Sequence, residues 1–105
     1  MDISERDGGK ILKLKHGDLL TVTLEGSRTT GHTWEVMPVD DAVLKQLDEV
    51  EYKPISDKLG APGKFTFRFE TTTFGQQTLK LVYHRPWETT VSPAKTFEVT
   101  VVVKG

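Results

Sequence analysis

The fold is decided by residues 64–84, which read KFTFRFETTTFGQQTLKLVYH. Apolar residues alternate with polar residues in both halves of this stretch. The apolar positions are Phe65, Phe67, Phe69, Leu79, Leu81 and Tyr83. A period of two is typical of β-strands that bury one face and leave the other in water. The stretch therefore predicts two consecutive strands with a turn between them at residues 71–75.

The same alternation recurs on both sides of this stretch. The periodic segments predict seven strands, at residues 10–15, 18–24, 33–37, 49–53, 64–70, 76–84 and 95–103. Residues 40–51 differ because Val43, Leu44 and Leu47 have helical spacing, so we expect one helical turn or an irregular crossover there. Short strands separated by turn signals indicate an all-β chain, folded as an immunoglobulin-like β-sandwich of about seven to eight strands.

The length of 105 residues fits one domain with a single core. The sequence contains no internal repeat and no low-complexity linker. We therefore expect one domain over residues 1–105, with residues 1–8 as a flexible N-terminal tail. The first residues are polar and do not resemble a signal peptide. The expected location is the cytoplasm, or outside the cell after removal of a signal, and the sequence does not choose between them.

Charge and residue types exclude several classes of function. A balance of 14 basic and 15 acidic residues argues against nucleic-acid binding, which needs a basic surface. The absence of cysteine excludes disulfides, thiolate catalysis and cysteine zinc sites. His32 and His84 could meet at one end of the sandwich and hold a weakly bound metal, but we favour solvent-facing histidines. We expect no catalytic residue, no metal and no cofactor, so the chain is not predicted to be an enzyme.

Strand direction predicts where the connections lie. If successive strands from residue 18 onward run antiparallel, the connections at residues 25–32, 54–63 and 85–94 fall at one end of the sandwich. Loops that converge on a rigid sheet scaffold make a binding surface. The function is therefore placed on these three loops.

The two tryptophans have different expected roles. Trp34 is in phase with the apolar positions of its strand and is assigned to the core. Trp87 follows Pro86 beyond the end of a strand and lies beside Arg85, and Trp and Arg are both common in binding hot spots. We favour a binding role for Trp87 over core packing. Gly31 suits a tight turn with positive φ, which is compatible with a binding role.

Taken together, three motifs resemble the chagasin family of cysteine protease inhibitors. The motifs are Thr29-Thr30-Gly31 followed by Trp34, Gly60-Ala61-Pro62-Gly63, and Tyr83-His84-Arg85-Pro86-Trp87. The chain departs from the family pattern at Ser27-Arg28, where Asn-Pro is usual, at His32, where an aromatic residue is common, and at Pro62, where glycine is usual. The resemblance spans most of the chain. It implies an immunoglobulin-like fold and three loops that enter the active-site cleft of a papain-like cysteine protease.

The resemblance implies a reversible, tight-binding inhibitor with a papain-like cysteine protease as its protein partner. The balanced charge gives no reason to expect a nucleic-acid or membrane partner, and nothing in the sequence indicates an obligate dimer, so we expect a monomer when free. The protease-binding residues that it implies are Thr29, Thr30, Gly31, His32, Leu59, Gly60, Ala61, Pro62, Gly63, Arg85, Pro86 and Trp87. Arg85 would bond either a protease carbonyl or the inhibitor's own loop. The alternative function is a non-inhibitory immunoglobulin-like adhesion or interaction module that uses the same loop end.

Overall fold

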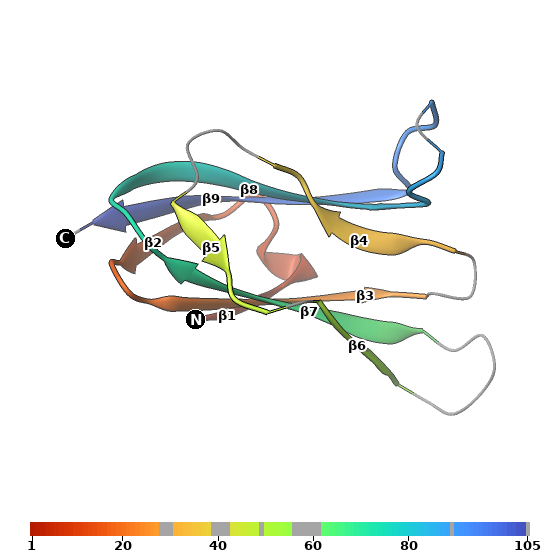
Figure 1. The fold of residues 1–105 in the computed structure, drawn as a ribbon, viewed down its shortest axis with the longest axis horizontal. Coiled ribbons are helices and arrows are strands. Elements are labelled where there is room, and N and C mark those ends of the chain that lie inside the picture. The colour runs from red at the N-terminus through yellow and green to blue at the C-terminus, as the bar shows by residue number, and fades with distance from the viewer. Residues whose placement is uncertain (28–30, 39–42, 49, 56–61, 89, 105) are drawn as a thin grey trace.

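The structure, a computed structural model, describes residues 1–27, 31–38, 43–48, 50–55, 62–88 and 90–104. In these residues two β-sheets pack face to face, as Figure 1 shows. The strands are β1 (Asp2–Ser4), β2 (Ile11–Lys15), β3 (Leu19–Gly26), β4 (Thr33–Val36), β5 (Leu44–Gln46), β6 (Glu51–Pro54), β7 (Gly63–Thr71), β8 (Gly75–His84) and β9 (Lys95–Lys104). A 3₁₀ turn, η1 (Glu5–Asp7), follows β1. No helix in the described part of the chain has the length and apolar character needed to span a membrane.

The two sheets have different strand orders. One sheet runs β1-β3-β7-β5, and β6 pairs with a separate part of β7. The other sheet runs β2-β9-β8-β4. The pairs β1–β3 and β2–β9 are parallel, and the other pairs are antiparallel. The prediction of an all-β, immunoglobulin-like sandwich is confirmed.

The core lies between the sheets because alternating residues of both sheets point inward. All six apolar residues that define the pattern at residues 64–84 are buried. Trp34 is 3% exposed, in agreement with its predicted core position. Its indole N–H donates a hydrogen bond to the carbonyl oxygen of Glu25 at 3.2 Å. The chain has no cysteine, so burial of this apolar surface is the main stabilising contribution to the fold.

Residues 2–7 differ from the expected flexible tail. Ile3 pairs with Val22 in the β1–β3 ladder, and its side chain is buried in the core. The Asp7 carboxylate accepts hydrogen bonds from the Lys10 ammonium at 2.8 Å and from the Ser4 N–H at 2.9 Å. These two bonds lower the pKa of the Asp7 carboxyl. A strand of three residues is too short to show a period of two, so the sequence pattern does not reveal it.

The predicted helical turn is wrong at Leu44–Gln46, which forms β5 and pairs with the end of β7. The side-chain oxygen of Gln77 accepts hydrogen bonds from the N–H groups of Val43 at 2.8 Å and Leu44 at 3.1 Å. Both of these residues are buried, whereas Leu47 is exposed. The three residues with helical spacing therefore do not form one buried face of a helix. Residues 40–42 and 49 of the predicted segment lie outside the described residues.

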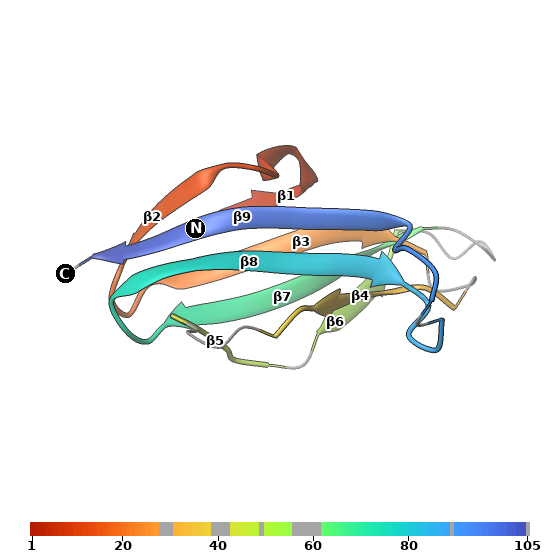
Figure 2. The ribbon, with the colours of Figure 1, turned by 90° about the horizontal axis from the view of Figure 1, so that it is seen from above.

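The strand ends that flank the three predicted loops lie at one end of the sandwich, as Figures 1 and 2 show. Ladder pairs tie these ends together within each sheet. Gly26 at the end of β3 pairs with Gly63 at the start of β7, and Thr33 at the start of β4 pairs with His84 at the end of β8. The assumption that successive predicted strands run antiparallel therefore places each of the three connections at the correct end of the sandwich.

Candidate functional site

Seven of the twelve predicted binding residues lie in the described part of the chain. They are Gly31, His32, Pro62, Gly63, Arg85, Pro86 and Trp87. The other five, Thr29, Thr30, Leu59, Gly60 and Ala61, lie outside the described residues. Six of the seven described residues lie in the three connections at the loop end of the sandwich, and Gly63 is the first residue of β7.

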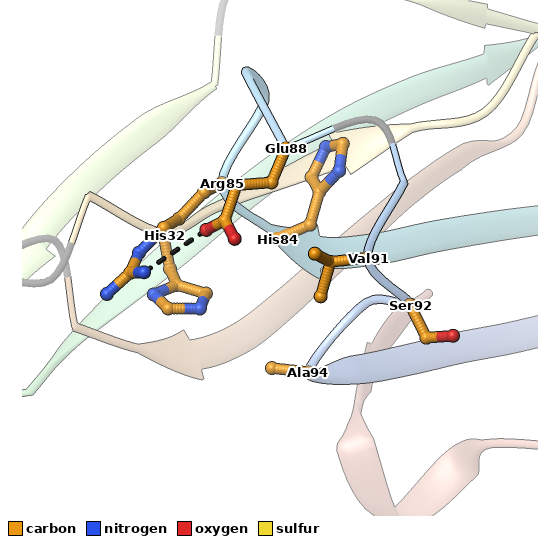
Figure 3. A pocket seen from close by; sticks show the side chains of 7 residues that line it. All are labelled: His32, His84, Arg85, Glu88, Val91, Ser92 and Ala94. Carbon is orange, nitrogen blue, oxygen red and sulfur yellow. Dashed lines mark hydrogen bonds and ion pairs between the residues drawn. The ribbon is translucent and has the colours of Figure 1, made fainter.

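The third loop begins with a tight turn at residues 85–88. The N–H of Glu88 donates a hydrogen bond to the carbonyl oxygen of Arg85 at 3.0 Å, which closes a four-residue turn. Pro86 occupies the second position of this turn, where its fixed φ is favourable. The Arg85 guanidinium also donates to the Glu88 carboxylate at 3.1 Å, as Figure 3 shows. Arg85 therefore supports its own loop in the free protein, which is one of the two predicted roles.

The turn presents Trp87 to the first loop. Trp87 is 68% exposed, but its indole lies directly against Gly31. A β-carbon added at Gly31 would lie 2.5 Å from Cη2 of Trp87, which is closer than atoms can approach. Gly31 also has a φ of +83°, a conformation that favours glycine. The positive φ confirms the turn geometry expected at Gly31, and its role in binding stays a prediction.

Tyr83 connects the third loop's strand to the first loop. Its hydroxyl accepts a hydrogen bond from the N–H of Ser27 at 2.8 Å and donates one to the Ser27 carbonyl oxygen at 2.7 Å. Its ring stacks on the ring of His32, with centroids 5.0 Å apart. The sequence assigned Tyr83 to a core strand and to a motif, but not to a role in the loop. The available signal was its place two residues before Arg85.

Gly63 has a different position from the other predicted binding residues. It is buried within β7, where Gly26 on β3 and Pro54 on β6 pair with it on either side. A β-carbon added at Gly63 would lie 2.5 Å from the ring of Tyr52. The backbone of Gly63 is thus already paired on both sides within the sheet, at the base of the second loop. Pro62, the residue before it, is exposed.

A cavity of about 180 Å³ lies beneath the third loop, and His32 and His84 both line it (Figure 3). Both histidines are half-buried rather than solvent-facing as predicted. His84 Nε2 lies 3.5 Å from a carboxylate oxygen of Glu35, whereas the His32 ring stacks on Tyr83. Among the described residues, no three histidine, cysteine, aspartate or glutamate side chains are grouped to hold a metal ion.

The comparison with protein families finds a match over most of the chain. Residues 13–101 match the model described as "Chagasin family peptidase inhibitor I42". The chain belongs to the chagasin family. It is therefore an inhibitor of cysteine proteases and not an enzyme. The family match confirms the resemblance inferred from the three motifs and favours inhibition over the alternative of an adhesion module.

This chagasin-family chain is similar to two curated proteins of Entamoeba histolytica. It is 28% identical to Amoebiasin-2 over 104 residues, which cover 97% of this chain and 84% of that protein. It is also 28% identical to Amoebiasin-1 over 109 aligned residues, which cover 99% of this chain and all of that protein.

Solved structures share the fold. The crystal structure of the cysteine protease inhibitor EhICP2 from Entamoeba histolytica aligns with a TM-score of 0.83 and 25% identity, over 98% of this chain and 94% of that chain. The solution structure of Amebosin aligns with a TM-score of 0.75 and 28% identity, over 99% and 97% of the two chains. PbICP-C, solved in complex with falcipain-2, is 20% identical with a TM-score of 0.65 over 98% of each chain, and it supports the fold alone.

Proposed function

We propose that this inhibitor blocks papain-like cysteine proteases by pressing its three-loop end into the active-site cleft. The observation that carries the proposal is the contact between Trp87 and Gly31, which joins the third loop to the first. An exposed indole fixed by a neighbouring loop presents a large apolar surface that is already ordered. Binding then loses less side-chain entropy than it would with a free indole.

The first loop would lie beside the catalytic cysteine and histidine of the protease. Thr29, Thr30, Gly31 and His32 would cover this centre with backbone, without a peptide bond in position for attack. Catalysis requires the reacting atoms to be close and aligned, so a loop held in another geometry is not cut. The positive φ of Gly31 supports this proposal, because most residues cannot adopt the same backbone course.

The second and third loops would grip the two rims of the cleft. Leu59, Gly60, Ala61 and Pro62 form the proposed contact of the second loop. The small residues Gly60 and Ala61 would let the backbone approach a protease strand closely. Gly63 is left out of this contact because its own strand pairs on both sides of it.

In the third loop, Trp87 would lie on an apolar part of the rim. Pro86 would stiffen the turn, and Arg85 would hold it closed through Glu88. Trp87 has the exposure and support expected of a binding hot spot.

Titration of active proteases tests the proposal. Papain and a cathepsin-L-like enzyme should lose activity stoichiometrically at tight-binding concentrations of the purified protein. A serine protease with a similar cleft should keep its activity, because its catalytic groups and rims differ. Full activity of both cysteine proteases in the presence of excess folded protein would refute the proposal.

A further inference from the structure

We infer that Tyr83 is a positioning residue that protects the first loop from cleavage by the bound protease. The inference rests on the proposed function, because it concerns the behaviour of residues 25–32 inside a protease cleft. Tyr83 itself is only 7% exposed and lies within β8, so its effect on a protease must pass through the residues that it holds.

Both ends of the segment at residues 28–31 are held by this one side chain. Before the segment, the Tyr83 hydroxyl makes two hydrogen bonds to the backbone of Ser27, one as acceptor and one as donor. After the segment, the His32 ring stacks on the Tyr83 ring with an interplanar angle of 22°. The residue that precedes the segment and the residue that follows it are therefore tied to the same rigid point.

Tyr83 is itself fixed by its other neighbours. Its ring packs against Trp34 in the core, with centroids 5.3 Å apart. A β-carbon added at Gly26 would lie 2.7 Å from Cε1 of Tyr83, so the backbone of β3 fits closely against the ring edge. The Nζ atom of Lys95 lies 5.7 Å from the ring centroid. A side chain enclosed in this way cannot follow the movements of a loop, and it restrains the loop instead.

Restraint of both ends opposes hydrolysis for two reasons. The scissile carbonyl must reach the protease thiolate in an aligned geometry, and holding Ser27 and His32 on one side chain opposes that movement. After cleavage, the two new ends must separate before water can complete the reaction, and ends tied to one side chain stay close enough to rejoin. The reaction adds one water molecule across one peptide bond and leaves a new carboxylate and a new amine. The protease supplies the nucleophilic thiol.

The test compares the wild-type protein with Tyr83→Phe, which keeps the stacked ring and removes both hydrogen bonds to Ser27. Each protein is incubated with papain while residual activity and intact mass are followed over time. Wild type should stay intact and inhibit without change. The variant should inhibit about tenfold more weakly, as the loss of two neutral hydrogen bonds predicts. Activity should then return as two fragments appear, cut within residues 28–31, whose masses sum to the intact mass plus one water.

A matched control separates positioning from stability. Val101→Ala removes buried core volume on β9, where Val101 pairs with Gln77 and Leu12 away from the loop end. This variant should lose stability, yet it should inhibit as tightly as wild type and remain uncut. Cleavage of the control at residues 28–31, or a folded Tyr83→Phe variant that inhibits like wild type and stays intact, would overturn the inference.

A measurement on the wild type keeps the inference testable if the variant does not fold. The Ser27 amide proton should exchange with solvent far more slowly than in an unstructured peptide, because Tyr83 accepts its hydrogen bond. Exchange at the peptide rate would overturn the inference even if inhibition is normal. A wild type that exchanges slowly but does not inhibit papain would instead refute the proposed function, and the inference would fall with it.

Discussion

Trp87 and Gly31 are in direct contact across two loops, and the space beside Gly31 is filled by the indole of Trp87. The two residues are 56 positions apart in the sequence and belong to different connections. Their contact makes the first and third loops one unit. A change in either residue should therefore alter the shape of both loops at the binding end.

Gly31→Ala should weaken inhibition of the protease beyond what its loss of folding stability explains. Gly9 has the same φ of +83° but has no atom within 4 Å of an added β-carbon, so Gly9→Ala is a matched control. Each variant should lose about 1 kcal/mol of stability from backbone strain. Only Gly31→Ala should displace the exposed Trp87 indole, change its fluorescence and weaken inhibition. Denaturant unfolding and protease titration of both variants check the prediction, and equal inhibition by the two would contradict it.

Trp87→Ala should weaken inhibition by roughly 2 kcal/mol or more, as truncation of a hot-spot residue does. Phe74 is a control of similar exposure, at 60%, in the β7–β8 connection at the opposite end of the sandwich. Phe74→Ala should leave the inhibition constant unchanged. Unfolding curves should show that both variants remain folded. Unchanged inhibition by Trp87→Ala would remove Trp87 from the binding surface.

Arg85→Ala and Glu88→Ala should have similar small effects on inhibition, because each removes the same ion pair. The pair is partly exposed, so the expected effect of each change is about 0.2–1 kcal/mol. The double variant should be no weaker than either single variant, since the interaction is already lost. A double-mutant cycle of inhibition constants measures this coupling. An additional loss specific to Arg85→Ala would show that Arg85 makes a contact beyond its pair with Glu88, either in its own loop or with the protease.

The glycine pair Gly26–Gly63 should respond unequally to alanine. At Gly26 the added β-carbon meets Tyr83, which is buried and fixed by two hydrogen bonds, so we expect a loss of about 2–3 kcal/mol. At Gly63 it meets Tyr52, which is only partly buried and can shift, so we expect about 1 kcal/mol. Urea unfolding of the two variants checks the order. A more stable Gly26→Ala variant would contradict it.

Asp7 should contribute to stability only when it is ionised. Its pKa in the folded protein is lowered from 3.8, chiefly by the hydrogen bond from Lys10 and then by that from Ser4. The contribution is therefore complete above pH 3.8 and is lost as the pH falls through the lower folded-state pKa. Asp7→Asn should be less stable than wild type at neutral pH, and the gap should narrow in acid. Unfolding free energies that differ by a constant amount at every pH would contradict this.

The sequence predicted the sandwich because long strands with one buried face repeat with a clear period. It also predicted the end of the sandwich at which the three loops lie, because the alternating direction of successive strands does not depend on where each strand begins or ends. It missed β1 and β5, whose three residues each cannot display a period. In the candidate site, Trp87 and Gly31 were both predicted as binding residues, but their contact could not be predicted, since nothing in the sequence gives the direction of the indole. Tyr83 was assigned to a core strand, which its burial confirms, but the alternation gives no sign that its hydroxyl reaches Ser27.

The two tyrosines that lie over the paired glycines have a practical consequence. Tyr83 and Tyr52 lie against the two glycines where β3 ends and β7 begins, between the core and the first two loops. Replacement sequences could then be grafted between Ser27 and Gly31 without repacking the interior. Variants with new protease specificities could then be selected from a library in which only those positions differ and the β-sandwich is unchanged.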